Sequence, residues 1–335
     1  MLPDNAPRFR TGTDHVESWF VRANDPGRPR AVWLKATVLT RADGTAVSQA
    51  WFSAFDGDRT AGFRHDVPLG DSTFESTVTD LGVRVGPLSL DLGAFDGTSS
   101  GALESDAGRV TWDLSFTRAP GPLGAPMCLL PSRRLVDARF PKNKLLSPFP
   151  VAAFLGEMLW DDERWDLDGW TGMQGHNWGA AHSPEYAWGQ CVFLDQRGTP
   201  YAVLEAASGR IELGSRQSPL LSMLVVRRGA REYRFDRVAD LWRQRPTLDF
   251  PRWSLGMRGR DGEATLEMVG SPSAMVCLGY QNPARSLSHC LNSKTAGVRL
   301  RLAPRQGEPF ELHSGHGGAL EFLRPDPIPE VQPVV

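Results

Sequence analysis

Residues 172–179 read Gly-Met-Gln-Gly-His-Asn-Trp-Gly and place groups that can do chemistry beside aromatic surface. His176 titrates near neutral pH, so it can give or take a proton in a reaction. In an extended segment His176 and Trp178 share a face, whereas Asn177 points the other way and is expected to fix the backbone near the glycines. Because tryptophan rings attract cations, the pair predicts a proton donor beside a cation-binding surface. A buried histidine bonded to a backbone carbonyl fits the same residues.

A second group of candidate residues lies on the hairpin formed by residues 185–194 and 199–207. With Asp195-Gln196-Arg197-Gly198 as the turn, Trp188 is expected opposite Glu205. One face then carries polar and aromatic side chains: Tyr186, Trp188, Gln190, Tyr201 and Glu205. The other face is small or apolar: Ala187, Gly189, Cys191, Ala202, Leu204 and Ala206. The first face predicts a cavity wall, in which Glu205 would orient His176 or raise its pKa.

The first predicted hairpin adds an acid, a base and two more tryptophans. Residues 17–23 and 31–39 flank the turn-rich segment Asn24–Arg30, and alternation puts Glu17 and Trp19 on one face of their strand. Trp33 and Lys35 share a face of the partner strand, and we expect the two faces to coincide. A surface ion pair packed against tryptophans is the alternative.

The pattern of strands and turns predicts an all-β chain. Sixty glycines and prolines punctuate short strand-like runs, and turn signals recur every 8–12 residues, which favours sandwiches or barrels. We expect an N-terminal domain over residues 1–120, a Pro/Gly-rich crossover over 121–165, a C-terminal domain over 166–325 and a tail over 326–335. Residues 152–160 are the one segment in which we expect a short helix.

Composition and motifs exclude several classes of function. The net charge of −2 gives no electrostatic footprint for nucleic acid, and no apolar run is long enough for a membrane helix. The N-terminus lacks the apolar segment of a signal peptide, so we expect a cytoplasmic protein with free thiols; a peripheral membrane contact stays compatible with the sequence. The histidines lack the spacing of a metal site, and there is no P-loop, Gly-x-Gly-x-x-Gly or Gly-x-Ser-x-Gly motif. No metal or cofactor is therefore predicted.

Residues 15–37 and 172–191 together resemble the superfamily of tocopherol cyclase-like, carotenoid 1,2-hydratase-like and AttH-like proteins. This resemblance implies two successive lipocalin-like (calycin) antiparallel β-barrels or sandwiches, with a ligand pocket within or between them, an architecture similar to that of the decalin-forming Diels–Alderases. It also implies large apolar substrates and no organic cofactor. In the hydratase branch a His-x-Trp pair carries the proton chemistry, and His176 and Trp178 match it. Glu205 matches the acid, whereas Tyr201 departs from the position of the family's tyrosine.

These observations predict an enzyme that needs no cofactor and that cyclises, isomerises or hydrates a hydrophobic isoprenoid or polyketide. His176, Glu205 and Trp178 are the expected catalytic residues. The expected substrate-binding residues are Trp188, Gln190, Tyr186, Tyr201, Asn177, Trp19, Trp33, Glu17 and Lys35. Two alternatives are a carrier of a hydrophobic small molecule and an interaction protein whose pocket its own side chains fill.

Overall fold

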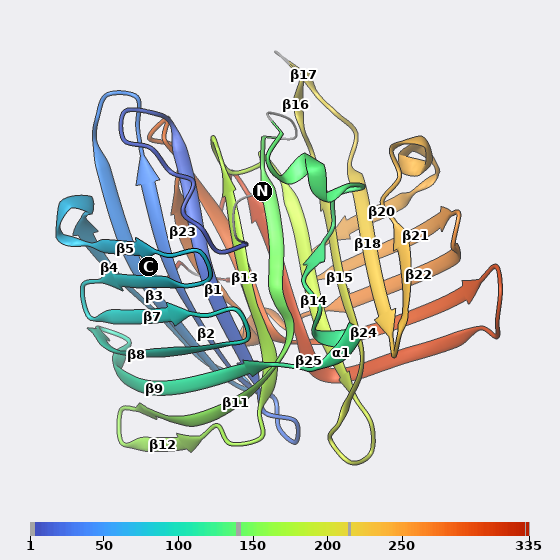
Figure 1. The fold of residues 1–335 in the computed structure, drawn as a ribbon, viewed down its shortest axis with the longest axis horizontal. Coiled ribbons are helices and arrows are strands. Elements are labelled where there is room, and N and C mark those ends of the chain that lie inside the picture. Colours follow the sequence, from blue (N-terminus) through green and yellow to red (C-terminus); the bar gives the residue numbers. More distant parts are fainter. Residues whose placement is uncertain (1–3, 139–141, 214–215, 332, 335) are drawn as a thin grey trace.

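Two large antiparallel sheets follow one another along the chain and pack against each other (Figure 1). The computed structural model describes residues 4–138, 142–213, 216–331 and 333–334. The all-β class predicted from the strand rhythm is confirmed. In Figure 1 the strands of the first sheet run from blue through green to yellow-green, and those of the second from yellow-green to red.

The first sheet has a strongly bent path, because strands β5 to β9 cross strands β1 to β4 at a steep angle in Figure 1. This bend lets the sheet enclose a core of its own. Its strands, in spatial order, are β4 (Arg59–Pro68), β3 (Ala46–Asp56), β2 (Arg30–Thr40), β1 (His15–Asn24), β13 (Thr171–Gly179), β11 (Lys144–Trp160), β9 (Gly108–Arg118), β8 (Asp96–Ser105), β7 (Leu88–Leu92), β6 (Leu81–Val85) and β5 (Thr73–Ser76), while β10 (Met127–Cys128) and β12 (Glu163–Asp166) pair with β11.

The second sheet encloses a separate core built from its inward-facing side chains. Its strands, in spatial order, are β19 (Arg231–Phe235), β18 (Leu221–Arg228), β15 (Pro200–Gly209), β14 (Tyr186–Leu194), β25 (Phe310–Arg324), β24 (Leu287–Pro304), β22 (Gly262–Val269), β21 (Arg252–Gly259) and β20 (Arg245–Asp249), with β23 (Val276–Gln281) paired to β24. The remaining elements are short: β16 (Glu212–Leu213), β17 (Arg216–Gln217), α1 (Gly121–Gly124) and the 3₁₀ turns η1 (Leu69–Asp71), η2 (Arg133–Val136), η3 (Val238–Arg243) and η4 (Pro272–Ala274).

The sheet topology differs from the predicted domain boundaries. Strands β11 and β13 lie within the segments assigned to the crossover and the C-terminal domain, yet they pair with β9 and β1 of the first sheet. The passage to the second sheet therefore falls between Gly179 and Tyr186. The expected helix over 152–160 was wrong, because alternate residues Phe154, Met158 and Trp160 are buried, as in a strand.

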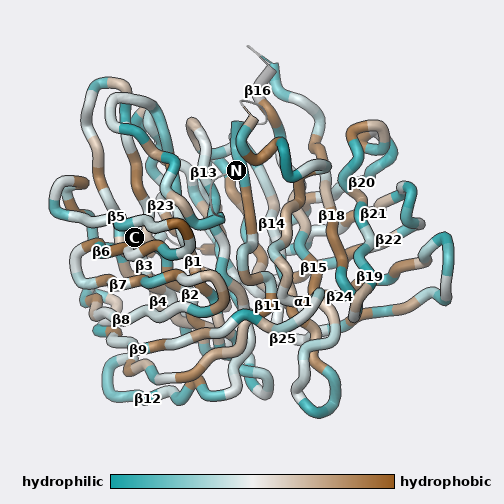
Figure 2. The backbone as a smooth tube through the Cα atoms, in the orientation of Figure 1, coloured by the Kyte–Doolittle hydropathy of each residue, from teal (hydrophilic) through white to brown (hydrophobic). Residues whose placement is uncertain are grey.

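A third apolar cluster joins the two sheets. Phe20, Trp33 and Trp51 of the first sheet pack there with Trp188 and Tyr280 of the second. In Figure 2 hydrophobic colour follows the strands and hydrophilic colour gathers at the turns, as expected for sheets buried on both faces. We call the facing surfaces of the two sheets the interface layer. It consists of this cluster and of the buried polar side chains beside it: Arg22, Lys35, Gln190, Glu205, Lys294 and Glu321.

Two further predictions concern cysteines and membranes. All four cysteines are free and buried, as expected. Within the described ranges, no helix has the length and apolar character needed to cross a membrane.

Candidate functional site

His176 lies inside the first sheet, bound to Glu17 rather than to Glu205. Strands β1 and β13 pair so that Trp19 is opposite His176 and Glu17 is opposite Trp178. The Nε2 atom of His176 lies 2.8 Å from Glu17 Oε1, and its Nδ1 lies 2.6 Å from the backbone oxygen of Asp4. Both ring nitrogens therefore face oxygen atoms, which hold the ring at both of its polar positions.

The N-terminal segment seals this histidine from solvent. The Glu17 carboxylate accepts the backbone N–H groups of Arg8 and Phe9 at 2.7–3.0 Å, and His15 reaches it at 3.2 Å. Trp19 stacks on the His176 ring at 4.9 Å, and both His176 and Glu17 are fully buried. His176 and Trp178 share a face, as predicted, with ring centroids 4.6 Å apart. This centre ties the N-terminus to the sheet and fits the structural alternative for His176.

The Glu17 carboxyl should make the fold sensitive to acid. Burial alone would raise its pKa, but hydrogen bonds from His15, His176 and the Arg8 backbone, together with the His176 charge, lower it to about 2. The stability it contributes is present above the unfolded pKa of 4.5 and is lost as pH falls from there towards 2. We expect the free energy of unfolding to fall by about 2 kcal/mol between pH 6 and pH 3 from this group. Urea unfolding of wild type and Glu17→Gln tests this, since the variant should lack that part of the pH dependence; equal slopes would contradict it.

In the first hairpin, the prediction that Glu17 and Trp19 share a face with Trp33 and Lys35 was wrong. Residues opposite each other share a face, and β1 pairs Trp19 with Ala36 but Phe20 with Lys35. The Asp25 N–H closes the loop on the Arg30 oxygen at 3.0 Å and fixes this register. Glu17 and Trp19 therefore face the core of the first sheet, whereas Trp33 and Lys35 face the interface layer. Both Glu17 and Lys35 are buried, so the alternative of a surface ion pair is also wrong.

The second hairpin keeps its predicted face although its register is shifted by two residues. Gln190, not Trp188, lies opposite Glu205, and a two-residue shift leaves each side chain on the same face. Trp188, Gln190 and Glu205 consequently all face the interface layer. Tyr201 does not join them, because the register shifts between Phe193 and Leu194 and Tyr201 packs against the C-terminal core. The predicted apolar face is confirmed, with Ala187, Cys191, Ala202, Leu204 and Ala206 in that core.

Glu205 is a buried carboxyl held by neutral donors. Its oxygens accept the Ser147 hydroxyl at 3.0 Å and the Trp188 indole N–H at 3.1 Å. Among the described residues it forms no ion pair. Burial raises its pKa to about 7, against the opposing effect of these donors. A carboxyl of this kind can exchange a proton at neutral pH.

Arg22 brings a buried cation to the same layer. Its guanidinium donates to Gln190 Oε1 and to the Gly317 backbone oxygen, the latter at 3.1 Å. The Gln190 amide also donates to the Pro150 oxygen at 2.8 Å, so Gln190 links β14 to both β1 and β11. Burial lowers the pKa of Arg22 to about 10. Arg22 Nε finds no acceptor in the described part of the chain.

Two lysines and one glutamate form the other end of the layer. Lys294 donates to Glu321 at 2.6 Å, and Asn292 and Tyr186 also reach that carboxylate at 3.2 and 3.4 Å. Lys35 lies over the rings of Tyr280, Trp51 and Trp33, 3.6, 4.8 and 5.0 Å from their centroids. Burial, together with the nearby Lys294 ammonium, lowers the pKa of Lys35 to about 7.

These groups form one continuous row across the interface layer. Glu205 bonds Trp188, Lys294 lies over Trp188 at 5.5 Å and over Trp33 at 5.1 Å, and Trp33 adjoins Lys35. The row holds a carboxyl and an amine that both titrate near neutral pH, separated by aromatic rings. Such pairs of perturbed groups are concentrated at functional sites.

Some of the predicted site residues lie together in the interface layer, and others lie elsewhere in the structure. Trp188, Gln190, Tyr186, Trp33, Lys35 and Glu205 meet in the layer, whereas His176, Trp178, Glu17 and Trp19 lie on the other side of the first sheet. Asn177 lies opposite Ser18 on β1 and is half-buried. The layer also contains six candidates that the sequence patterns did not indicate: Arg22, Trp51, Ser147, Tyr280, Lys294 and Glu321. A lone lysine or arginine within an apolar strand, as at Arg22 in residues 17–23, was the available signal.

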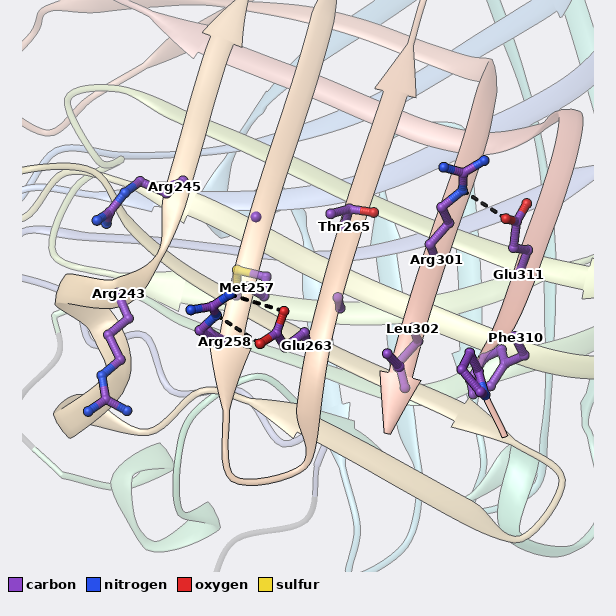
Figure 3. Close-up of a pocket in the computed structure, with 14 residues that line it drawn as sticks. Arg243, Arg245, Met257, Arg258, Glu263, Thr265, Arg301, Leu302, Phe310 and Glu311 are labelled. Atoms are coloured by element: carbon purple, nitrogen blue, oxygen red, sulfur yellow. Dashed lines mark hydrogen bonds and ion pairs between the residues drawn. The ribbon is translucent and has the colours of Figure 1, made fainter. Parts of the chain in front are cut away.

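An open groove of about 1060 Å³ lies apart from this layer, on the second sheet. Figure 3 shows its ion pairs Arg258–Glu263 and Arg301–Glu311, with distances of 3.0 and 2.8 Å. Among the described lining residues there is none of the predicted site residues. Two of the four arginines in its described lining form these exposed ion pairs with its two glutamates, and this lining holds none of the buried titratable groups found in the interface layer. The described residues also contain no cluster of His, Cys, Asp and Glu able to hold a metal ion.

Solved structures place this fold in a known group. CghA aligns with a TM-score of 0.63 and 13% identity over 94% of this chain and 90% of its own, and a structure of CghA with Sch210972 aligns at 0.61, with 12% identity over 93% and 89%. A putative AttH from Nitrosomonas europaea aligns at 0.56, with 12% identity over 97% and 99%. Kievitone hydratase from Nectria haematococca aligns at 0.56, with 12% identity over 92% and 88%. Neither the protein-family models nor the curated proteins gave a match.

These neighbours belong to the AttH-like, carotenoid hydratase-like group of double-lipocalin proteins. The two sheets of this chain therefore have the double-lipocalin fold, and the fold implied by the sequence resemblance is confirmed. At 12–13% identity the likeness concerns the fold alone.

Proposed function

We propose that this chain is an enzyme that binds a hydrophobic molecule in the interface layer and cyclises, isomerises or hydrates it by acid–base chemistry without a cofactor. The observation that carries the proposal is the buried row from Glu205 to Lys35. A fold that needed only packing would gain stability from apolar side chains there, since unpaired buried charges are costly. Names of neighbours agree with such a role: one is a hydratase of kievitone, and another was solved with Sch210972.

In this proposal Glu205 is the proton donor. Its pKa of about 7 leaves it partly protonated at neutral pH, and Ser147 and Trp188 stabilise the carboxylate that remains after the proton leaves. The faces of Trp188 and Trp33 lie along the row, where they would stabilise a carbocation by about 0.5–2 kcal/mol each. These side chains are buried, which strengthens the electrostatic effects on the reacting atoms; for a hydration, one water molecule would have to enter with the substrate.

The first experiment tests whether the protein retains an apolar molecule. Native mass spectrometry of protein from its own cells, followed by organic extraction, is expected to yield an apolar compound. Turnover of that compound or its precursor should fall at least 100-fold in Glu205→Gln, in the range seen for loss of a general acid. Glu263→Gln, at an exposed surface position, is the matched control and should keep full activity. Full activity of a folded Glu205→Gln would overturn the assignment.

The alternatives give different results. A carrier would release the same compound unchanged, with no difference in turnover between wild type and Glu205→Gln. An interaction protein with a filled pocket would yield no apolar compound, and apolar ligands would leave its tryptophan fluorescence unquenched.

A further inference from the structure

Three hydrogen-bond donors gather at Lys35 without an acceptor. The Lys35 ammonium makes no hydrogen bond or ion pair with the described residues, and the indole N–H groups of Trp33 and Trp51 find no acceptor among them either. Trp33 precedes Lys35 by two residues on β2, and Trp51 lies directly opposite it on β3, so all three side chains share a face. Lys35 is 95% buried, its side chain enclosed by aromatic rings.

Among the described residues, four buried indole N–H groups lack an acceptor, those of Trp33, Trp51, Trp160 and Trp165, and the first two of these lie beside the Lys35 ammonium. The indole N–H groups of Trp19, Trp188 and Trp253 donate to oxygens at 2.9–3.1 Å. Trp160 and Trp165 differ from Trp33 and Trp51 because they pack beneath the guanidinium groups of Arg59 and Arg30, which are partly exposed, rather than beside a buried ammonium. A buried donor without a partner destabilises the fold, and two such indoles beside an ammonium that has no acceptor point to a partner that arrives with a ligand.

The charges of the layer indicate the sign of that partner. Arg22, Lys35 and Lys294 are cationic, whereas Glu205 and Glu321 are the carboxylates that face them. Glu321 is engaged by Lys294, and Glu205 by Ser147 and Trp188. When every group is ionised, the layer has one more positive charge than negative charges. Among the described residues, Lys35 is the cation of the layer that has neither a hydrogen-bond acceptor nor a carboxylate partner.

We propose that Lys35, Trp33 and Trp51 bind an anionic oxygen, a carboxylate or an enolate, at the polar end of an apolar ligand. The ammonium supplies the opposite charge and the two indoles supply neutral donors, while the surrounding rings contact the apolar body. This inference rests on the proposed function, in which the interface layer binds a hydrophobic molecule. It adds the chemical class of the ligand and the residues that fix its orientation.

The site should bind its ligand more weakly as pH rises. Lys35 carries its charge below about pH 7, so affinity for an anion should fall about tenfold per pH unit above that value. The titratable and charged groups that face Lys35 from neighbouring elements are His182, Tyr186, Tyr280, Cys290, Lys294 and Glu321, with Arg64 behind Trp51. Burial holds His182 neutral, with a pKa of about 4, raises the pKa values of both tyrosines and of Cys290, and lowers that of Lys294, while the pKa of Lys35 itself is about 7.

The test compares three ligands of equal chain length: dodecanoate, dodecanol and dodecylamine, each below its micelle-forming concentration. Tryptophan fluorescence and calorimetry at pH 6.5 should show dodecanoate binding at least tenfold more tightly than dodecanol, with dodecylamine weakest. Lys35→Met should abolish the preference for dodecanoate and leave dodecanol unchanged. Lys142→Met removes an exposed lysine and should behave as wild type.

A second variant keeps the test decisive if Lys35→Met fails to fold. Trp51→Phe retains a ring but loses the N–H donor, and we expect it to weaken dodecanoate binding about threefold to tenfold while dodecanol is unaffected. Equal binding of dodecanoate and dodecanol by wild type would overturn the anion site but leave an apolar binding site standing. Failure of all three ligands to bind would overturn the anion site and also count against the proposed function.

Discussion

Replacing Lys35 with methionine is expected to raise the free energy of unfolding at pH 7 by about 2–4 kcal/mol. The pKa of Lys35 is 10.5 in the unfolded chain and about 7 in the fold, so folding requires a buried amine to lose part of its charge. Methionine has a similar length and keeps the contacts with Trp33, Trp51 and Tyr280 without that cost.

The sign of the pH dependence follows from the lowered pKa. Stability that depends on neutral Lys35 is fully present above pH 10.5 and is lost as pH falls from there towards 7. Wild type should therefore gain stability between pH 7 and pH 9.5, a gain that Lys35→Met should lack. Urea unfolding at the two pH values, with Lys142→Met as control, measures the effect. Destabilisation of Lys35→Met at pH 7 would show that the lysine supports the fold and is not retained for binding.

Replacing His176 with alanine is expected to have the opposite effect and to lower the free energy of unfolding by about 3–5 kcal/mol. The substitution removes the partner of the buried Glu17 carboxylate and opens a space between Trp19 and Trp178. It also releases the Asp4 carbonyl, and with it one of the contacts that hold the N-terminal segment.

The double variant Glu17→Gln with His176→Ala separates the two causes. Removing the charge should recover part of the lost stability, because no unpaired carboxylate then remains in the core. Denaturant unfolding of the single and double variants gives the coupling energy. A His176→Ala variant of unchanged stability that loses all turnover would instead make His176 catalytic, as the His-x-Trp resemblance implied.

The sequence predicted correctly which side chains share a face where alternation within a strand decides it. The prediction failed where the pairing of strands or tertiary contacts decide it. Trp188, Gln190 and Glu205 were placed on one face correctly, although the register was shifted, because a shift of two residues preserves the face. Trp19 and Lys35 were placed together wrongly, because opposite residues on β1 and β2 are odd-numbered on one strand and even-numbered on the other.

Local sequence patterns could not predict the partners of the candidate residues. His176 meets Glu17 and Asp4, which lie more than 150 residues away, and Lys35 meets Tyr280 on β23. Neither contact follows from periodicity, since each depends on how separate strands pack. The composition of the layer could nevertheless be predicted in part, because Lys35 is the only charged residue in the segment Ala31–Leu39.

The most direct test of the central claim, that the interface layer and not the His176 centre binds the ligand, is photo-crosslinking with a dodecanoate that carries a diazirine on its chain. After irradiation at pH 6.5, peptide mapping should place the label on strands β2, β14 or β24, near Trp33, Trp188 and Lys294. Excess dodecanoate should compete, and Lys35→Met should lower the yield. Label on β13 beside His176, or in the groove at Arg258 and Arg301, would contradict the account.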